Sequence, residues 1–190
     1  IINNLEQPRT ASESREQEQE QPQSLITFTI KIRKENTMSI IIKLTSDDTS
    51  IELPYEVAIL SKMVSDILED KIDLENPDDV TDEDKLVPLS AEKVSGALLT
   101  KIGEFCTHYH EEAMTPIEFN GKKKFDEIVT QQWYHNFISE FSGTDIIPLI
   151  KAADYLHLPP LLHLSILKMS STILGKTEHD MREFFNIAHP

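Results

Sequence analysis

Cysteine and glycine are scarce in this sequence. One cysteine, Cys106, and five glycines occur among its 190 residues. A single cysteine cannot form an internal disulfide or supply the paired cysteines of a structural zinc site, so we expect a reducing environment, the cytoplasm and nucleus. Five scattered glycines cannot build a glycine-rich phosphate-binding loop, which disfavours a nucleotide-dependent enzyme.

Positive charge and long apolar runs are also scarce. Eighteen Lys and Arg residues stand against 33 Asp and Glu residues, which gives a net charge of -15. A surface of this sign repels nucleic acid, because phosphate binding needs clustered cations. No apolar run approaches the roughly 20 residues of a membrane span. We therefore expect no nucleic-acid or membrane partner, and the length suits one ordinary domain.

The N-terminal part of the chain mixes polar and strand-like segments. Residues 1–24 are rich in Glu, Gln, Ser and Pro and poor in large apolar residues, so we expect them to be disordered. Residues 26–33 alternate strictly between apolar and polar side chains, which is typical of a half-buried strand. Residues 39–53 predict two strands around a polar turn, and Pro54 is expected to begin a helix through YEVAILSKM.

Helices dominate the chain after an acidic loop at 70–85. The run LVPLS at 86–90 predicts a buried strand, and Ser90 is expected to cap the long amphipathic helix that follows it. Further helix boundaries are predicted at Thr144, Pro159, Gly175 and Thr177. Strands mixed with helices and then helices alone predict an α+β fold with a helical extension.

The sequence CTHYH is the nearest approach to a metal or nucleophile cluster. Cys106 and His110 lie one helical turn apart, with His108 between them. A zinc site needs at least a third protein ligand, and the other histidines are scattered, so a packed thiol beside exposed imidazoles is favoured. A small metal-dependent hydrolase using these three residues stays as the weakest alternative.

Residues 145–158 form an amphipathic helical pattern with an unusual solvent side. At about 100° per residue the apolar side chains share one continuous face: Ile146, Leu149, Ile150, Ala152, Ala153 and Leu156. The opposite face carries Ile147, Lys151, Asp154, Tyr155 and Leu158. An exposed tyrosine with two aliphatic neighbours indicates either an incidental surface residue or a contact with another protein.

The helical pattern at 159–174 is apolar on two sides. One stripe consists of Leu162, Ile166, Met169 and Ile173, and the other of Leu164, Leu167 and Leu174. A surface helix needs only one such stripe, so the second meets either its own domain or a partner. The next helical pattern adds Met181, Phe184, Phe185 and Ile187, which together make a candidate docking surface.

From Met38 to Ile187 the sequence resembles the S-phase kinase-associated adaptor family, the small linker subunits of SCF-type cullin–RING ubiquitin ligases. The resemblance lies in five blocks in the same order: SIIIKLTSDD, EVAILSKMVSDILED, VPLSAEKVSGALLTKIGEFCTHYHEE, IPLIKAADYLHLPPLL and LGKTEHDMREFFNI. Because the blocks cover most of the chain, the match is specific. It implies a non-enzymatic protein with a BTB/POZ fold and additional C-terminal helices, and no cofactor.

The resemblance also implies partners and contact residues. The expected cullin N-terminal domain contacts are Ile147, Lys151, Asp154 and Tyr155. The expected contacts with F-box proteins are Leu158, Leu162, Ile166, Met169, Ile173, Met181, Phe184, Phe185 and Ile187. The implied organisation is an extra N-terminal segment at 1–37, a BTB/POZ domain at 38–130 and a helical cullin- and F-box-binding extension at 131–190.

Several positions depart from the family pattern. Asp154 stands in place of an Asn, which exchanges a neutral donor and acceptor for an anion that only accepts. Pro159 and Pro160 replace a Lys-Gly pair, Phe105 replaces a Trp, and the family's acidic final helix is lacking. These departures indicate a diverged paralogue, and they keep a second hypothesis open: a BTB-type interaction module with one binding surface only. Self-association through the BTB surface is a further expectation.

Overall fold

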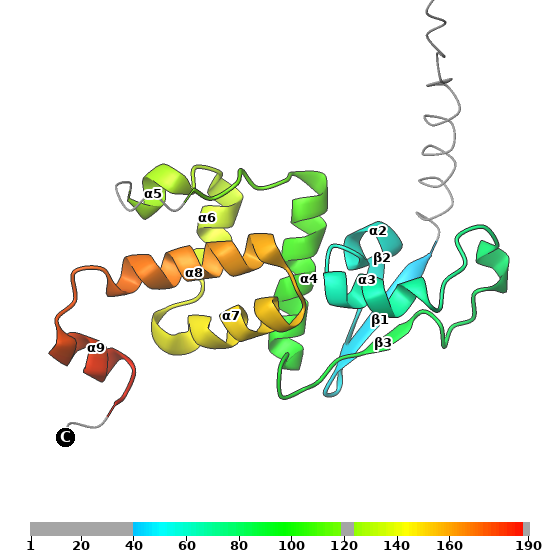
Figure 1. The fold of residues 1–190 in the computed structure, drawn as a ribbon, viewed down its shortest axis with the longest axis horizontal. Coiled ribbons are helices and arrows are strands. Elements are labelled where there is room, and N and C mark those ends of the chain that lie inside the picture. The colour runs from blue at the N-terminus through cyan, green and yellow to red at the C-terminus, as the bar shows by residue number, and fades with distance from the viewer. Residues whose placement is uncertain (1–39, 119–123, 188–190) are drawn as a thin grey trace, which may run out of the picture.

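The structure is a computed structural model that describes residues 40–118 and 124–187 (Figure 1). The N-terminal elements are β1 (Ile41–Ser46), β2 (Thr49–Pro54), α2 (Tyr55–Ala58), α3 (Lys62–Glu69), the 3-10 turn η1 (Pro77–Asp79), β3 (Leu86–Pro88) and α4 (Gly96–Glu111). The C-terminal elements are α5 (Phe125–Ile128), α6 (Gln132–Ser139), η2 (Gly143–Asp145), α7 (Ile146–Tyr155), α8 (Pro159–Ile173) and α9 (Glu178–Phe184). The strand predicted at 26–33 lies outside the described residues.

The strands form a small mixed sheet in the order β2-β1-β3. β1 and β2 are an antiparallel hairpin in which Ser46 lies opposite Thr49, and Asp47 takes a positive φ of 49° in the turn. β3 runs parallel to β1, with Val87 opposite Leu44. The strands predicted within 39–53 and at 86–90 are therefore confirmed, and one small sheet with many helices is the expected α+β class.

The helix predicted to start at Pro54 is shorter than expected. Pro54 precedes α2, which has only four residues. The helix is then interrupted, and α3 begins at Lys62. Ser61 causes the second start, because its side chain accepts a hydrogen bond from the N–H of Val64. Such an N-cap satisfies a backbone donor that no helical carbonyl can reach.

Ser95, not Ser90, caps the long helix α4. The Ser95 side chain accepts a hydrogen bond from the N–H of Leu98. At Gly96, the first residue of α4, a Cβ atom would lie 2.1 Å from Thr49 Oγ1, so only glycine lets the helix start this close to the sheet. The prediction failed because both serines are competent caps and only the contact with the hairpin separates them.

The C-terminal helix boundaries are mostly as predicted. Pro159 occupies the first turn of α8, Gly175 follows its end with a φ of 79°, and Thr177 and Asp180 form a capping box at α9. The prediction for Thr144 was wrong, because this residue lies in η2 and Asp145 precedes α7 without a side-chain cap. A 3-10 turn leading into the helix leaves no position for a capping hydroxyl.

Aromatic packing joins the C-terminal helices to α4. Phe105 on α4 is 1% exposed and lies 5.8 Å from the ring of Tyr134 and 5.6 Å from that of Phe137, both on α6. The α7 and α8 helices pack against each other beside this cluster (Figure 1). The sheet, α4 and the C-terminal helices therefore share one hydrophobic core. No helix in the described part of the chain combines the length and apolar character required to cross a membrane.

Candidate functional site

The α7 helix has the two-sided character that its sequence predicts. Its inner face is closely packed, since Leu149, Ala152 and Ala153 are all 0% exposed. On its outer face Lys151 and Asp154 are exposed. Two further outer residues, Ile147 and Tyr155, are half-buried, and the Tyr155 ring packs partly against the core. This face therefore presents a partly packed aromatic residue beside two charged residues.

A hollow of about 740 Å³ opens beside Tyr155. Its walls come from α7, from the segment preceding α4 and from the first turn of α4. The lining residues are Ala91, Glu92, Lys93, Ser95, Leu98, Pro148, Lys151, Asp154 and Tyr155. Three of the four predicted cullin contacts line it, while Ile147 does not. A concave site with apolar walls and charged groups can bind a side chain that projects from a partner protein.

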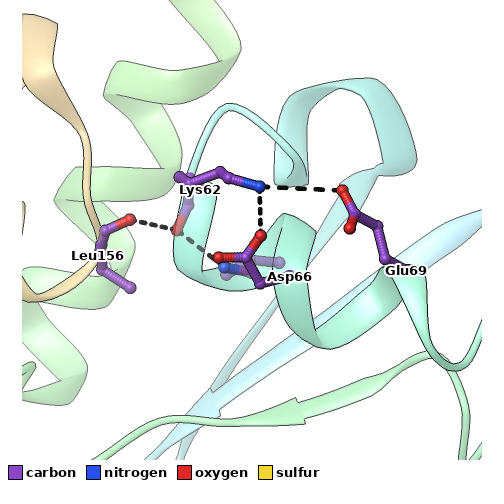
Figure 2. Close-up of polar contacts among 6 residues, drawn as sticks. Lys62, Asp66, Glu69 and Leu156 are labelled. Atoms are coloured by element: carbon purple, nitrogen blue, oxygen red, sulfur yellow. Dashed lines mark hydrogen bonds and ion pairs between the residues drawn. The ribbon is translucent and has the colours of Figure 1, made fainter.

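Ser61 connects the turn between α7 and α8 to the start of α3 by hydrogen bonding. Its Oγ donates a hydrogen bond to the carbonyl of Leu156 at 2.6 Å, across 95 residues of sequence. The N–H of Lys62 donates to the carbonyl of His157 at 3.4 Å. Figure 2 shows Leu156 beside Lys62 at the start of α3. Ser61 thus joins the N-terminus of one helix to the C-terminus of another, where the two partial charges attract.

The same corner overturns the expected position of Leu158. The sequence pattern placed Leu158 on the solvent side, but it is 2% exposed. The α7 helix ends at Tyr155, and His157 has a positive φ of 50°, so the chain turns before Leu158. Leu158 therefore faces the core and offers almost no surface for an F-box contact.

Exposure of apolar residues rises along α8. Leu161 and Leu164 are 0% exposed, whereas Ile166 is 37% exposed and Leu174, after the helix end, is 84% exposed. The remaining predicted F-box contacts on this helix are half-buried: Leu162, Met169 and Ile173. One side of α8 therefore belongs to the core, as the buried Leu167 shows, while another side leaves apolar side chains partly exposed, most of all towards the helix end.

The α9 helix continues this surface without a core of its own. Met181, Phe184 and Phe185 are half-buried and Ile187 is 53% exposed, while no residue of the helix is buried. The rings of Phe184 and Phe185 contact each other at 4.9 Å. Figure 1 shows α9 at the far end of the molecule from the sheet. The predicted F-box residues other than Leu158 therefore lie on exposed or half-buried positions of α8, of α9 and of the residues directly after α9.

The structure argues against a nucleophile at Cys106. The thiol is 4% exposed, and burial raises its pKa to about 12, so the reactive thiolate is absent near neutral pH. His108 stacks on Trp133 with ring centroids 3.9 Å apart, and His110 is exposed. Among residues 40–118 and 124–187, no group of three or more metal-ligating side chains comes together.

Sequence reasoning missed two contributions to these surfaces. Ser61 was not predicted, because its bond to Leu156 joins distant segments and leaves no local pattern. The wall of the hollow formed by Ala91–Ser95 was also missed, since that segment was assigned to a helix. The serine before α3 was the one available signal, because an N-cap there would have predicted the helix break.

Comparison with known proteins identifies the family. The model described as "Skp1 family, tetramerisation domain" matches residues 39–111. SKP1-like protein 4 of Arabidopsis thaliana is 33% identical over 154 residues, which cover 80% of this chain and 85% of that protein. The SCF ubiquitin ligase complex protein SKP1a of Dictyostelium discoideum is 26% identical over 151 residues. These residues cover 79% of this chain and 85% of that protein. On this evidence the chain belongs to the Skp1 family.

Proposed function

We propose that this protein is a non-enzymatic adaptor of an SCF-type cullin–RING ubiquitin ligase, bridging a cullin N-terminal domain and F-box proteins. Relatives that match over most of their length include one named as an SCF ubiquitin ligase complex protein. The outer face of α7 and the adjoining hollow bind the cullin, with Ile147, Lys151, Asp154 and Tyr155 as contacts. The partly exposed apolar side of α8, from Leu162 to Ile173, and the residues from Met181 to Ile187 bind the F-box.

The observation that carries the proposal is the placement of these surfaces on consecutive helices. α7 and α8 pack against each other, and each has a buried inner side. One presents Tyr155 beside a hollow, and the other presents an apolar stripe. An adaptor of this kind acts by positioning, because holding two partners on one body raises their effective concentration without chemistry.

Titration calorimetry with a recombinant cullin N-terminal domain tests the first surface. We expect Tyr155→Ala to weaken binding by roughly 2 kcal/mol or more, as buried aromatic anchors do, with the fold intact by circular dichroism. Tyr155→Phe keeps the ring and serves as the matched control. Unchanged affinity of the alanine variant would remove the cullin assignment.

The second surface is tested by co-purification with an F-box peptide. Met181→Asp and Phe184→Asp each place a charge on the apolar side of α9 and are expected to weaken binding, because a carboxylate resists burial. Asn186→Asp adds the same charge at an exposed neighbouring residue outside the predicted contacts. Equal recovery of the peptide with all three variants would mean that the F-box binds elsewhere.

The alternative is a BTB-type module that uses one surface only, and the absence of buried residues in α9 favours it. Co-expression separates the two functions. A full adaptor recovers a cullin and an F-box protein together, whereas a one-surface module recovers one of them. Sedimentation of the free chain measures self-association through the BTB surface in the same preparation.

A further inference from the structure

Within residues 40–118 and 124–187, the charged residues that line the hollow beside Tyr155 form no ion pairs. Glu92, Lys93, Lys151 and Asp154 all line the hollow and are exposed. In the described ranges, none of the four takes part in an ion pair. Three other lysines of the described residues, Lys62, Lys85 and Lys101, are paired with carboxylates, and the remaining ones are not.

Two charges of each sign line the hollow together with apolar side chains. Lys151 and Asp154 are three residues apart on the outer face of α7, and Glu92 and Lys93 are neighbours in the segment before α4. Tyr155, Leu98 and Pro148 supply the apolar part of the lining. The hollow is therefore neutral in sum, although the chain carries a net charge of -15.

We propose that the hollow is a socket selective for charge pattern. It admits a cullin segment that places an acidic side chain against Lys151, a basic one against Asp154 and an apolar one against Tyr155. Charges that lose water on binding and find no counter-charge oppose association, so a partner must supply both signs. The inference rests on the proposed adaptor function and names the kind of cullin surface that it fits.

The net charge of the chain alone leads to a different expectation. A strongly acidic protein attracts any basic surface, and exchanging two opposite charges on it changes little at long range. In a patterned socket the same exchange places like charges against each other at both positions. A charge exchange within α7 therefore separates the two descriptions.

The test compares two double variants by calorimetry against a recombinant cullin N-terminal domain. Lys151→Asp with Asp154→Lys inverts the pattern in the hollow and keeps the composition. Lys62→Asp with Asp66→Lys is the matched control, because it exchanges an exposed pair on α3 outside the hollow. We expect the first variant to bind at least about tenfold more weakly and the control to bind as the unmodified chain does.

Each outcome has one meaning. Weaker binding of the Lys151 and Asp154 variant alone supports the socket. Equal binding of all three proteins overturns the socket and leaves the adaptor function intact. Absence of binding by the unmodified folded chain removes the adaptor function and the socket together. If sedimentation instead shows a dimer that this variant loses, the hollow binds a second copy of the chain and not a cullin.

Discussion

The α7 and α9 helices carry the two proposed binding surfaces on very different supports. Behind the outer face of α7 lie Leu149, Ala152 and Ala153, all 0% exposed, whereas α9 has no buried residue. A surface whose helix has a buried inner face is already ordered in the free protein. Little of the binding free energy is then lost in ordering it. A surface whose helix lacks such a face gains its packing from the partner. The proposed cullin surface is thus preformed, and the proposed F-box surface would gain its packing from the partner.

The largest effect is expected from a pair of alanine substitutions that tests this contrast. Leu149→Ala removes a fully buried side chain from α7 and is expected to lower the free energy of unfolding by about 2–5 kcal/mol, through lost burial and the cavity left behind. Met181→Ala on α9 is expected to change it by about 0.5 kcal/mol or less, because surface substitutions away from the core rarely do more. Urea unfolding measures both, and similar losses would refute the contrast.

A second test uses the pH dependence of the free energy of unfolding. It concerns Cys106, a buried residue of α4 in the hydrophobic core. The folded pKa of this thiol, about 12, exceeds its ordinary value of 9.0 because the thiolate is desolvated. Its stabilising contribution is therefore complete below pH 9 and is lost as pH rises towards the folded pKa. At about pH 10.5 we expect the free energy of unfolding to be lower by about 2 kcal/mol from this group.

The control for the pH test is Cys106→Ala, measured by urea unfolding at about pH 8 and about pH 10.5. Tyr134, whose pKa burial raises to about 12, stays in this variant and accounts for a remaining alkaline loss. The variant should lose less stability between the two pH values than the unmodified chain. An identical loss in both proteins would show that Cys106 titrates normally in the folded state.

Local patterns in the sequence predicted much of this fold. The α7 face follows from the spacing of apolar residues alone, and the α9 capping box follows from Thr177 and Asp180. Five sequence blocks also gave the family, and membership of the Skp1 family confirms the expectation of a protein that is not an enzyme. These features are local, or they recur among relatives, so a single sequence contains them.

The errors have two physical origins, contact between distant segments and local turns that the helical spacing does not reveal. Ser95 was missed as the cap of α4 because its advantage over Ser90 depends on the fit of Gly96 against the β1–β2 hairpin. Leu158 was placed in solvent because helical spacing was extended past the turn at His157. The predicted cullin and F-box contacts stay predictions, since partner binding is a property of two molecules.

The smallest predicted effect concerns the corner that holds the preformed surface in place. Ser61→Ala removes both the cap of α3 and the hydrogen bond to the Leu156 carbonyl. We expect the free energy of unfolding to fall by about 1–2 kcal/mol, with a larger effect on the end of α7 than on α9. Hydrogen exchange should therefore speed up at the amides of Leu156 and Leu158. These residues lie close to Ser61 in the structure although they are distant from it in sequence.

Two control variants separate the buried hydroxyl from the exposed charges around it. Ser61→Thr keeps both hydrogen bonds and should exchange almost as slowly as the unmodified chain. Lys62→Met removes the ion pairs with Asp66 and Glu69 (Figure 2), which lie in solvent, and should leave stability unchanged. If Lys62→Met accelerated exchange at the α7–α8 corner as much as Ser61→Ala, exposed ion pairs would be holding the cullin surface in place. The contrast between the two surfaces would then depend on salt concentration, because such pairs are screened.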